Sequence, residues 1–391
     1  MTKIQDLIQK EEKRQNSITN LIASENYPSQ AVRDALSLFL VGKYAEGRPG
    51  ARYYGGNSIV DEIELATEAL VLKVFGLDEV DYAVNVQPYS GSIANLASYL
   101  GALDVEGSIL AMSLTHGGHL THGHSVSLTG KLFKSSHYGV SPDSYLLDYD
   151  AIKRQAVELK PKLIVCGATA YPRAIDFAKF REIADSCGAL LMADISHIAG
   201  LIAGGAHISP FPYADIVTST THKTLRGPRG AFIITRRGLK KDGKELSELI
   251  NRAIFPGIQG GPHMHTIASM GVAMEEALTP EFRDYAHRVL DNAQIMAEKL
   301  DDLGFEVLSG GTDNHLILIN ILSRGYYGQE AQEILEENGI IVNKNSIPFD
   351  TQKPNNPSGI RIGVQAETTR GRDSGFFVDI ATKISAILPK K

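Results

Sequence analysis

The stretch "PKLIVCGATAYPRAIDFAKFREIADSCGALLMAD", residues 161–194, reads as a strand, a helix and a second strand in close succession. Its two ends, "PKLIVCG" and "ALLMAD", are short apolar runs of the kind that form buried strands. Between them, "DFAKFREIADSCG" repeats apolar residues at helical spacing and stops at Gly188, a residue type that often ends helices. This order predicts two parallel strands joined by a crossover helix.

Similar strand-like runs lie on both sides of this unit: "GSILAMSL" (107–114), "ADIVTST" (214–220) and "GAFIITR" (230–236). Their alternation with helical patterns predicts an α/β fold, with a mainly parallel central sheet and helices on both faces. In the last third, "NHLILINIL", "GQEAQEILEENG", "IIVNKN" and "GIRIGV" predict a smaller α+β unit, joined through a helix near 265–280. We therefore expect an N-terminal arm without a sheet of its own (1–50), a large domain (51–270) and a small C-terminal domain (271–391).

The overall composition limits the classes of function that the chain can have. The chain has 391 residues and a net charge of −6, which gives no general attraction to nucleic acid or anionic membranes. Cys166 and Cys187 lack the spacing of a zinc site, and no run approaches the roughly 18 apolar residues of a membrane span. These features predict a cytoplasmic protein that binds neither nucleic acid nor membranes.

Two reactive side chains follow neighbouring predicted strands. Asp194 ends "ALLMAD", and Lys223 follows the next strand within "STTHKTLRGPRG" (219–230). Ligands of parallel sheets bind at the carboxyl ends of strands, where a lysine can have a lowered pKa and attack a carbonyl as a neutral amine. Its hydroxyl-rich neighbours disfavour the alternative, an amine that reaches out to solvent. Asp194 could instead cap the next helix.

A third feature supplies a place for an anion. "QPYSGSIAN" (87–95) runs from a turn into a helix predicted to begin near Ile93, so Ser90, Gly91 and Ser92 could bind a phosphate at the helix N-terminus. A plain helix start is the alternative. A lysine, a carboxylate and a phosphate cradle together are what a pyridoxal phosphate (PLP) site needs.

One histidine cluster allows a different interpretation. "HGGHLTHGH" contains His116, His119, His122 and His124 and could suggest a metal. Structural zinc usually has better-separated ligands with help from cysteine or carboxylate, so we predict no metal site. The glycines more plausibly let the backbone pass close to a ligand.

Over nearly its whole length the chain resembles the serine hydroxymethyltransferase family, PLP enzymes of the aspartate-aminotransferase-like fold type I. These enzymes transfer the hydroxymethyl group of serine to tetrahydrofolate, which gives glycine and 5,10-methylenetetrahydrofolate. The matching blocks are "LIASEN", "YAEGRPGARYYGGN", "VNVQPYSGSIANL", "THGGHLTHG", "AYPRAIDF", "HIAGLIA", "TSTTHKTLRGPRG", "FPGIQGGP", "GGTDNH", "NKNSIPFD" and "SGIRIG".

The resemblance implies roles for individual residues. Lys223 would hold PLP as a Schiff base, Asp194 would pair with the ring nitrogen, and His119 would stack on the ring. The expected catalytic residues are Lys223, Glu46, Asp194, His119, Thr220, His222 and Tyr54. Cofactor contacts are expected from Ser90, Gly91, Ser92, His119, Thr169, Asp194, His197, His222, Lys223, Gly260 and Gly261. Serine or glycine would meet Ser24, Tyr44, Glu46, Tyr54 and Arg361, and folate would meet Tyr53, Leu114, Gly118, Leu120 and Asn345.

Two of these assignments have simpler alternatives. Arg361 could be a surface arginine, but Ile360 and Ile362 on either side put it on a largely buried strand, where its guanidinium could grip a carboxylate. Glu46 could be a solvated loop acid, whereas the resemblance makes it the group that handles a proton between serine and folate.

The resemblance also implies residues shared between subunits. In the family, the other subunit's site receives Tyr44, Glu46, Tyr54 and the pair Gly260 and Gly261. The resemblance therefore implies an obligate homodimer, and whether dimers pair into tetramers stays open.

The chain departs from the family's usual residues at several positions: Ile93, Thr169, Ser196, His263, Val364 and Gln365. It also ends soon after "DIATKISAILPKK". Several departures lie where they could reshape the folate or side-chain pocket. The alternatives are thus a folate-independent PLP aldolase or transaldolase acting on β-hydroxy amino acids, or a PLP-binding regulator or nucleic-acid-binding protein without catalysis. Retention of Glu46, Tyr53 and Asn345 disfavours the first. The second would need basic patches or a lost lysine, and the sequence has neither. The preferred amino-acid side chain and the folate's glutamate count stay open.

Overall fold

A mainly parallel β-sheet forms the centre of the larger part of the protein. The computed structural model describes residues 2–391, and within them this sheet has seven strands in the order β4-β10-β9-β8-β7-β5-β6. The strands β6, β5, β7, β8 and β9 pair in parallel, and only β10 runs antiparallel to its neighbours. Their bounds are β4 Tyr82–Asn85, β5 Ser108–Met112, β6 Lys134–Tyr138, β7 Leu163–Cys166, β8 Leu190–Asp194, β9 Ile216–Thr220 and β10 Ala231–Arg236.

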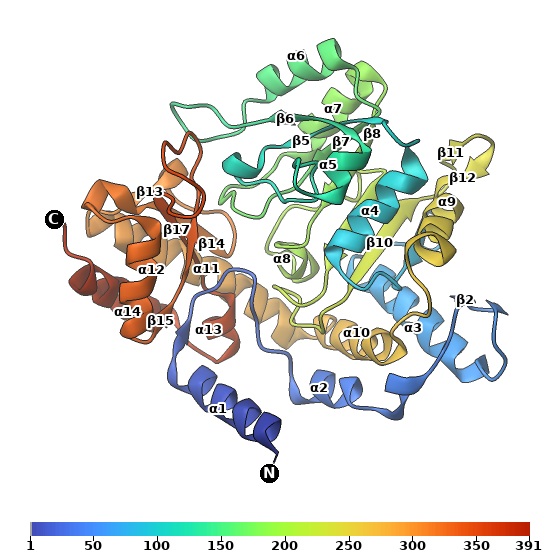
Figure 1. The fold of residues 1–391 in the computed structure, drawn as a ribbon, viewed down its shortest axis with the longest axis horizontal. Helices are drawn as coiled ribbons and strands as arrows, with labels where there is room; N and C mark the ends of the chain where they lie inside the picture. The colour runs from blue at the N-terminus through green and yellow to red at the C-terminus, as the bar shows by residue number, and fades with distance from the viewer. Residues whose placement is uncertain (1) are drawn as a thin grey trace.

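Helices cover both faces of this sheet (Figure 1). Because successive strand residues point to opposite faces, Ile109 and Ala111 pack with the helices α4 and α9, while Leu110 and Met112 belong to the core that includes α7. Both faces are buried, which explains why the strands are apolar throughout. The helices of this part are α3 Ser58–Val74, α4 Gly91–Ala102, α5 Leu128–Leu132, α6 Tyr149–Leu159, α7 Phe177–Cys187, α8 Ala199–Ala203, α9 Leu246–Arg252 and α10 Met264–Ala277.

The fold class expected from the sequence is confirmed. All five predicted strands are present within two residues of their expected ends, as β5, β7, β8, β9 and β10. The predicted crossover helix is α7, which Asp176 caps at its start and Gly188 ends in the left-handed conformation at φ 71°. The edge strands β4 and β6 were not predicted, and the sequence of β6, "KSSHY", is too polar to signal a strand.

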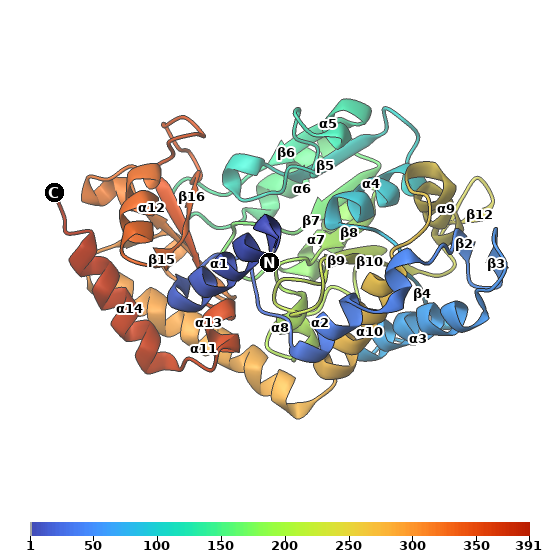
Figure 2. The ribbon, with the colours of Figure 1, turned by 60° about the horizontal axis from the view of Figure 1, so that its bottom comes forward.

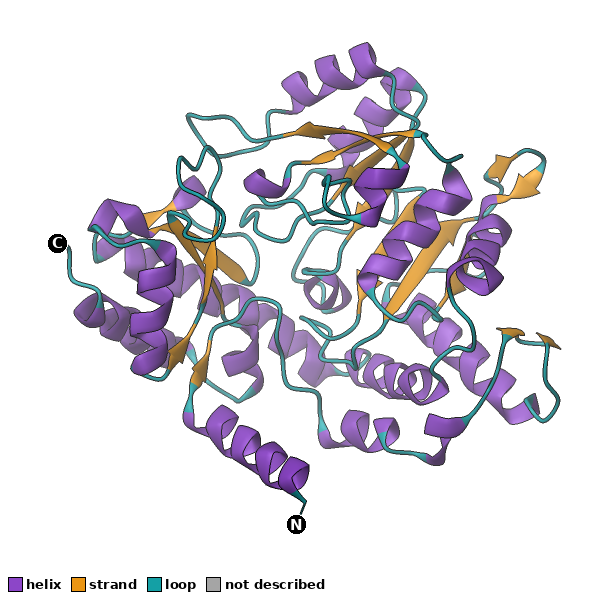
Figure 3. Ribbon diagram, viewed as in Figure 1, coloured by secondary structure: helices purple, strands orange, loops and turns teal. Residues whose placement is uncertain are grey.

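The last third forms a second, smaller sheet beside the first (Figure 3). Its order within the described residues is β13-β14-β17-β16, all antiparallel: Glu306–Val307, Leu316–Asn320, Gly359–Gly363 and Asn343–Asn345. Its helices are α11 Pro280–Asp302, α12 Gly328–Glu337, α13 Gln365–Thr369 and α14 Ser374–Ile387. The helix expected near 265–280 is α10. The domain bounds stay a prediction, and the one at residue 270 would fall inside α10.

The N-terminal arm forms short strand pairings with other segments of the chain. The arm was expected to have no sheet of its own, and both of its strands pair with strands outside residues 1–50: β1 (Thr19–Asn20) in parallel with β15 (Ile340–Ile341), and β2 (Gly47–Arg48) with β3 (Ala51–Arg52). The first helix, α1 (Lys3–Ser17), has no buried residue and stands in front of the rest in Figure 2. The next, α2 (Gln30–Leu36), packs on α10. A hairpin of β11 (Lys240–Lys241) and β12 (Lys244–Glu245) completes the strands.

Residues 2–391 include no helix that is both long enough and apolar enough to cross a membrane.

Candidate active site

A cavity of about 300 Å³ lies at the carboxyl ends of β8 and β9. It is lined by residues from the large sheet, from the start of α4 and from the N-terminal arm. Eleven residues that the sequence analysis predicted to be site residues line this cavity: Ser24, Ser90, Gly91, Ser92, His119, Thr169, Asp194, His197, Thr220, His222 and Lys223. Parallel sheets bind ligands at this edge, so the cavity is the candidate active site.

Lys223 lies three residues beyond the end of β9. Its Nζ donates a hydrogen bond to Thr220 Oγ1 at 3.0 Å, and its backbone carbonyl accepts one from Asn26 of the arm at 2.9 Å. Burial lowers the pKa of Lys223 to about 8, and the opposing charge of Asp194 limits the fall. An amine with this pKa has a substantial uncharged fraction near neutral pH, which a nucleophile needs.

Asp194 ends β8 and is surrounded by hydrogen-bond donors. Its Oδ2 accepts from Asn95 Nδ2 at 2.8 Å and from His122 Nε2 at 3.2 Å, and its Oδ1 accepts from the backbone N–H of Ser196 at 3.1 Å. Burial alone would raise the pKa of Asp194, but the hydrogen bonds from His122 and Asn95 bring it well below its usual range. The carboxylate is therefore ionised inside the cavity, and it does not cap α8, whose N-cap residue is Ile198.

Asn95 and His122 are functional candidates that the sequence reasoning missed as partners of Asp194. Both belong to motifs that had been singled out, "SGSIAN" and "HGGHLTHGH". Their positions, 99 and 72 residues from Asp194 along the chain, gave no sign that they would meet it.

The start of α4 supplies free backbone donors. The helix begins at Gly91, two residues before the predicted start near Ile93, and its N-cap residue Ser90 makes no side-chain capping bond. The first amides of a helix have no partner within the helix, so those of α4 lack the capping oxygen of an ordinary helix start. A methyl group on Gly91 would lie 2.7 Å from Thr220 Cγ2, so only glycine allows this close approach. The arrangement fits an anion such as phosphate.

Two of the histidines at the cavity, His119 and His222, are neutral donors or acceptors at neutral pH. Burial lowers the pKa of His119 to about 4 and that of His222 to about 3. The Nδ1 atom of His222 is buried without a hydrogen-bond partner, which leaves it available to a ligand.

The four histidines of "HGGHLTHGH" point to separate partners. His116 accepts from Val140 N, His119 bonds to Thr121, His122 bonds to Asp194, and His124 accepts from Val126 N. No group of three His, Cys, Asp or Glu residues that could hold a metal occurs in residues 2–391.

Arg361 lies on β17 of the small sheet, and only 6% of its surface is exposed, as its apolar neighbours predicted. Its Nη1 donates to the carbonyl of Thr169 at 2.7 Å and its Nε to Asn343 Oδ1 at 3.0 Å. Burial lowers its pKa to about 10, so the guanidinium stays charged at neutral pH. Its Nη2 has no hydrogen-bond partner in the described part of the chain, which leaves donors for a carboxylate.

A second cluster of nominated residues does not line this cavity. Tyr44, Tyr53 and Tyr54 form edge-on ring contacts at 5.6 Å (Tyr44 to Tyr54) and 5.3 Å (Tyr53 to Tyr54). Tyr44 is 60% exposed and Tyr53 is 80% exposed. A methyl group on Gly260 would lie 3.2 Å from Glu46 Oε1, and one on Gly261 would lie 3.3 Å from the Tyr44 ring. The cluster of Tyr44, Glu46, Tyr53, Tyr54, Gly260 and Gly261 thus gathers at the surface.

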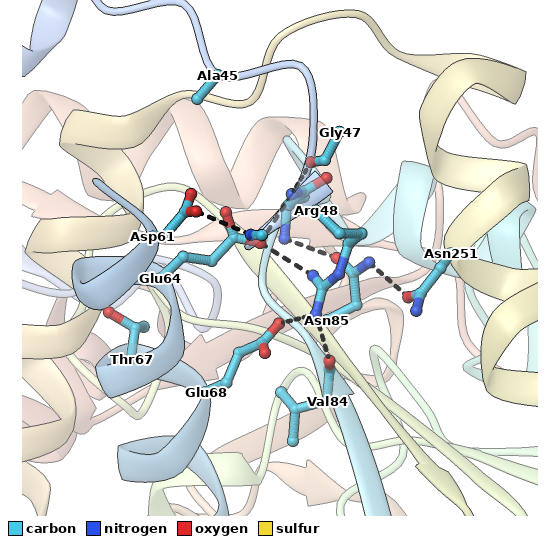
Figure 4. A network of polar contacts seen from close by, with 12 residues as sticks. Ala45, Gly47, Arg48, Asp61, Glu64, Thr67, Glu68, Val84, Asn85 and Asn251 are labelled. Carbon is cyan, nitrogen blue, oxygen red and sulfur yellow. Dashed lines mark hydrogen bonds and ion pairs between the residues drawn. The ribbon is translucent and has the colours of Figure 1, made fainter. Parts of the chain in front are cut away.

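The loop that carries Glu46 is held by buried ion pairs (Figure 4). Glu64, which is fully buried, accepts from Arg48 Nη1 at 2.9 Å and from Arg52 Nη2 at 2.6 Å. Arg52 Nη1 also donates to the carbonyls of Ala45 and Gly47, the residues on either side of Glu46, both at 2.8 Å. The backbone around Glu46 is therefore fixed although its side chain is near the surface.

The expected folate residues also lie outside the cavity lining. Leu114 begins the 3₁₀ turn η2 (Leu114–His116), Leu120 is 43% exposed, and Asn345 ends β16 with its Nδ2 bonded to the carbonyl of Ser346 at 2.6 Å. Gly118 passes so close to the carbonyl of Met112 that no side chain would fit.

Two of the departures from the family have clear partners. Gln365 Nε2 donates to the carbonyls of Ile22 and Glu25, at 2.8 and 2.6 Å, and so holds the arm segment that contains Ser24. The ring of His263 stacks on Tyr89 at 4.0 Å.

A lysine of lowered pKa, an ionised carboxylate and an uncapped helix start around one cavity of a mainly parallel sheet are the features of a PLP-dependent enzyme of fold type I. Comparison with known proteins gives the family. The chain belongs to the serine hydroxymethyltransferase family, whose model matches residues 1–384. It is 50% identical to a curated serine hydroxymethyltransferase of Desulfotalea psychrophila (strain LSv54 / DSM 12343) over 404 aligned positions, which cover 98% of this chain and 92% of the relative. Members of this family are PLP-dependent transferases that act on serine and glycine and use folate.

Proposed function

We propose that the cavity around Lys223 and Asp194 holds PLP and transfers the hydroxymethyl group of serine to tetrahydrofolate, which gives glycine and 5,10-methylenetetrahydrofolate. The observation that carries the proposal is the pairing of a low-pKa lysine with an ionised, buried aspartate in one cavity.

The residues around the cavity fit PLP. The hydroxyls of Ser90 and Ser92 and the first amides of α4 would bind its phosphate, and Asp194 would keep its ring nitrogen protonated. Lys223 would bond to its carbonyl carbon, and Thr220 Oγ1 orients the amine for that step. His119, His197, His222 and Thr169 complete the contacts to the ring. When bound, PLP supplies an electron sink for the pair released when the Cα–Cβ bond of serine breaks.

Residues on other segments of the chain would bind the carboxylate of serine and take the proton of its hydroxyl group. Arg361 bonds through Nη1 to the carbonyl of Thr169, which lines the cavity, and its free Nη2 donors would bind the serine carboxylate together with Ser24 of the arm. Glu46 would take the proton of the serine hydroxyl and pass it toward folate. Because Glu46 does not line the cavity of its own chain, we propose that it, Tyr44, Tyr54, Gly260 and Gly261 serve the cavity of a second copy. The active form would then be an obligate homodimer, with a cytoplasmic location.

The folate ring would bind at a set of residues outside the cavity lining: Tyr53, Leu114, Gly118, Leu120 and Asn345.

The proposed transfer to folate is tested by following a ¹³C label from C3 of serine. We expect the label to appear in 5,10-methylenetetrahydrofolate, and serine cleavage to be slow when folate is omitted. Losing one buried hydrogen bond in Asn345→Ala should weaken folate binding roughly ten- to hundredfold. Asn355→Ala, in an exposed loop, is the matched control. Equally fast cleavage without folate, with the label released as formaldehyde, would favour an aldolase instead.

A further inference from the structure

Two buried histidines from different sheets touch beside the cavity. His197 follows β8 of the large sheet, and His315 precedes β14 of the small one. His197 Nδ1 lies 3.2 Å from His315 Nε2, and the same Nε2 lies 3.1 Å from the carbonyl oxygen of Ala23 in the arm. His315 is fully buried and His197 is 4% exposed. One nitrogen of His315 therefore faces two groups at hydrogen-bond distance.

The Ala23 carbonyl decides which nitrogen of His315 carries the proton. A carbonyl oxygen only accepts, so a stable contact requires a proton on His315 Nε2. The opposite tautomer would aim a lone pair at Ala23 and put the proton on Nδ1, which is buried without a partner. That tautomer has two unfavourable features, whereas the Nε2–H tautomer only leaves Nδ1 as an unpaired buried acceptor, which is better tolerated than an unpaired buried N–H.

The proton on His315 in turn decides the state of His197. A proton on His197 Nδ1 would face the proton on His315 Nε2 across 3.2 Å, so Nδ1 must be the acceptor. Both rings are neutral at physiological pH, because burial lowers the pKa of His315 to about 3 and that of His197 well below its ordinary value. The single proton of His197 is then on Nε2.

We infer that His315 is a positioning residue that holds His197 in the Nε2–H tautomer, so that His197 presents a hydrogen-bond donor to the ligand in the cavity. The side chain of His197 lines the cavity, and its Nε2 has no hydrogen-bond partner within residues 2–391. The tautomer follows from the contacts among His197, His315 and the Ala23 carbonyl once both rings are neutral, and it does not depend on the proposed function. The identity of the ligand atom rests on the proposed function, in which it is an oxygen acceptor on PLP or on the substrate.

The pair also connects three parts of the fold. Ala23 precedes Ser24, which lines the cavity, and His315 directly precedes β14, the strand that pairs with the strand of Arg361. The donor state of His197 therefore depends on the arm and the small sheet being in place against the large one.

Nitrogen-15 NMR of the histidine side chains in the PLP-free protein tests the tautomer directly. We expect His197 with a protonated Nε2 and an unprotonated Nδ1, in about tenfold or greater excess over the other form. His315→Leu should remove this preference, and His315→Gln, which keeps an N–H donor of similar reach, should restore it. His287→Leu, at an exposed position of α11, is the control and should leave the His197 signals unchanged.

PLP binding to the same four proteins gives the second readout. We expect roughly tenfold weaker binding in His315→Leu, with recovery in His315→Gln and no change in His287→Leu. A protonated Nδ1 on His197 in the unaltered protein would overturn the inference, as would an unchanged tautomer in His315→Leu. A protein that shows the expected tautomer but does not bind PLP would contradict the proposed function and leave the role of His315 intact.

Discussion

Asn95 donates a hydrogen bond to Asp194 at 2.8 Å, although 99 residues separate the two along the chain. Asn95 lies in the second turn of α4, the helix whose first residues form the proposed phosphate cradle. One helix therefore presents amides at its N-terminus and, one turn later, supports the carboxylate that would hold the far end of the same cofactor. This arrangement fixes the distance between the two ends of the site.

Replacing Asp194 tests the electrostatic part of the account. Asp194→Asn keeps the shape of the side chain but loses the charge, so we expect serine cleavage to slow by several orders of magnitude while PLP still binds. Steady-state turnover and a PLP titration measure the two effects separately. Near-normal turnover in Asp194→Asn would remove this residue from its role.

Asn95→Ala should have a smaller effect of the same kind. It removes one of three hydrogen bonds to Asp194, a loss of about 1–3 kcal/mol that corresponds to turnover slower by roughly five- to 150-fold. The change is measured as kcat with saturating serine and folate. Asn355→Ala provides the comparison, and equal rates in the two variants would show that Asn95 does not support the carboxylate.

The pKa of Lys223 should be measurable in the PLP-free protein. Reductive methylation with ¹³C-formaldehyde followed by NMR should show one lysine that titrates near 8, and its signal should be missing in Lys223→Ala. Between about 8 and the ordinary lysine value of 10.5 the unfolded chain binds this proton more tightly than the folded one, so Lys223 adds stability as pH rises through that window. Titration of the Lys223 signal near 10.5 would contradict the burial argument.

Glu64 should be essential for the stability of the segment around Glu46. Glu64→Gln leaves Arg48 and Arg52 without their shared carboxylate, and breaking such a buried pair typically costs about 3–5 kcal/mol. Urea unfolding should show this loss, while Glu62→Gln, an exposed position on the same helix α3, should change little. If Glu64→Gln has the same free energy of unfolding as Glu62→Gln, the ion pairs of Glu64 do not stabilise this segment.

Mixing two inactive variants tests whether the active sites are shared. Glu46→Gln and Lys223→Ala should each lack activity alone. If Glu46 serves the partner's cavity, a mixed dimer contains one complete site, so random mixing of equal amounts after unfolding and refolding should recover about a quarter of the original activity. No recovery would show that Glu46 acts within its own chain or that the chains do not pair.

The sequence predicted the parts of the fold that depend on local pattern. The apolar runs of β7 and β8 and the Gly188 stop of α7 are signals within a few residues, and they were confirmed. The edge strand β6 was not predicted because its sequence is polar. An edge strand has a neighbour on one side only, and polar sequences are common there. The start of α4 was placed two residues late, an error of the size expected for helix ends, which local pattern defines poorly.

The candidate site was predictable where a residue's position on a strand implied its place. Asp194 and Lys223 end or follow neighbouring parallel strands, so they had to lie at one edge of the sheet. The contacts of Asn95 with Asp194 and of His315 with His197 depend on how helices and sheets pack in three dimensions. Roles assigned by resemblance, such as those of Glu46 and Asn345, stay predictions that the experiments above address.

We propose above all that Lys223 is the residue to which PLP bonds. Borohydride reduction makes a link between PLP and an amine permanent, and mass spectrometry of the digested protein then locates it. We expect the pyridoxyl group on the peptide that contains Lys223, and no such group at this site in Lys223→Ala. A reduced pyridoxyl group on a different lysine, or one that persists at this cavity in Lys223→Ala, would contradict the account.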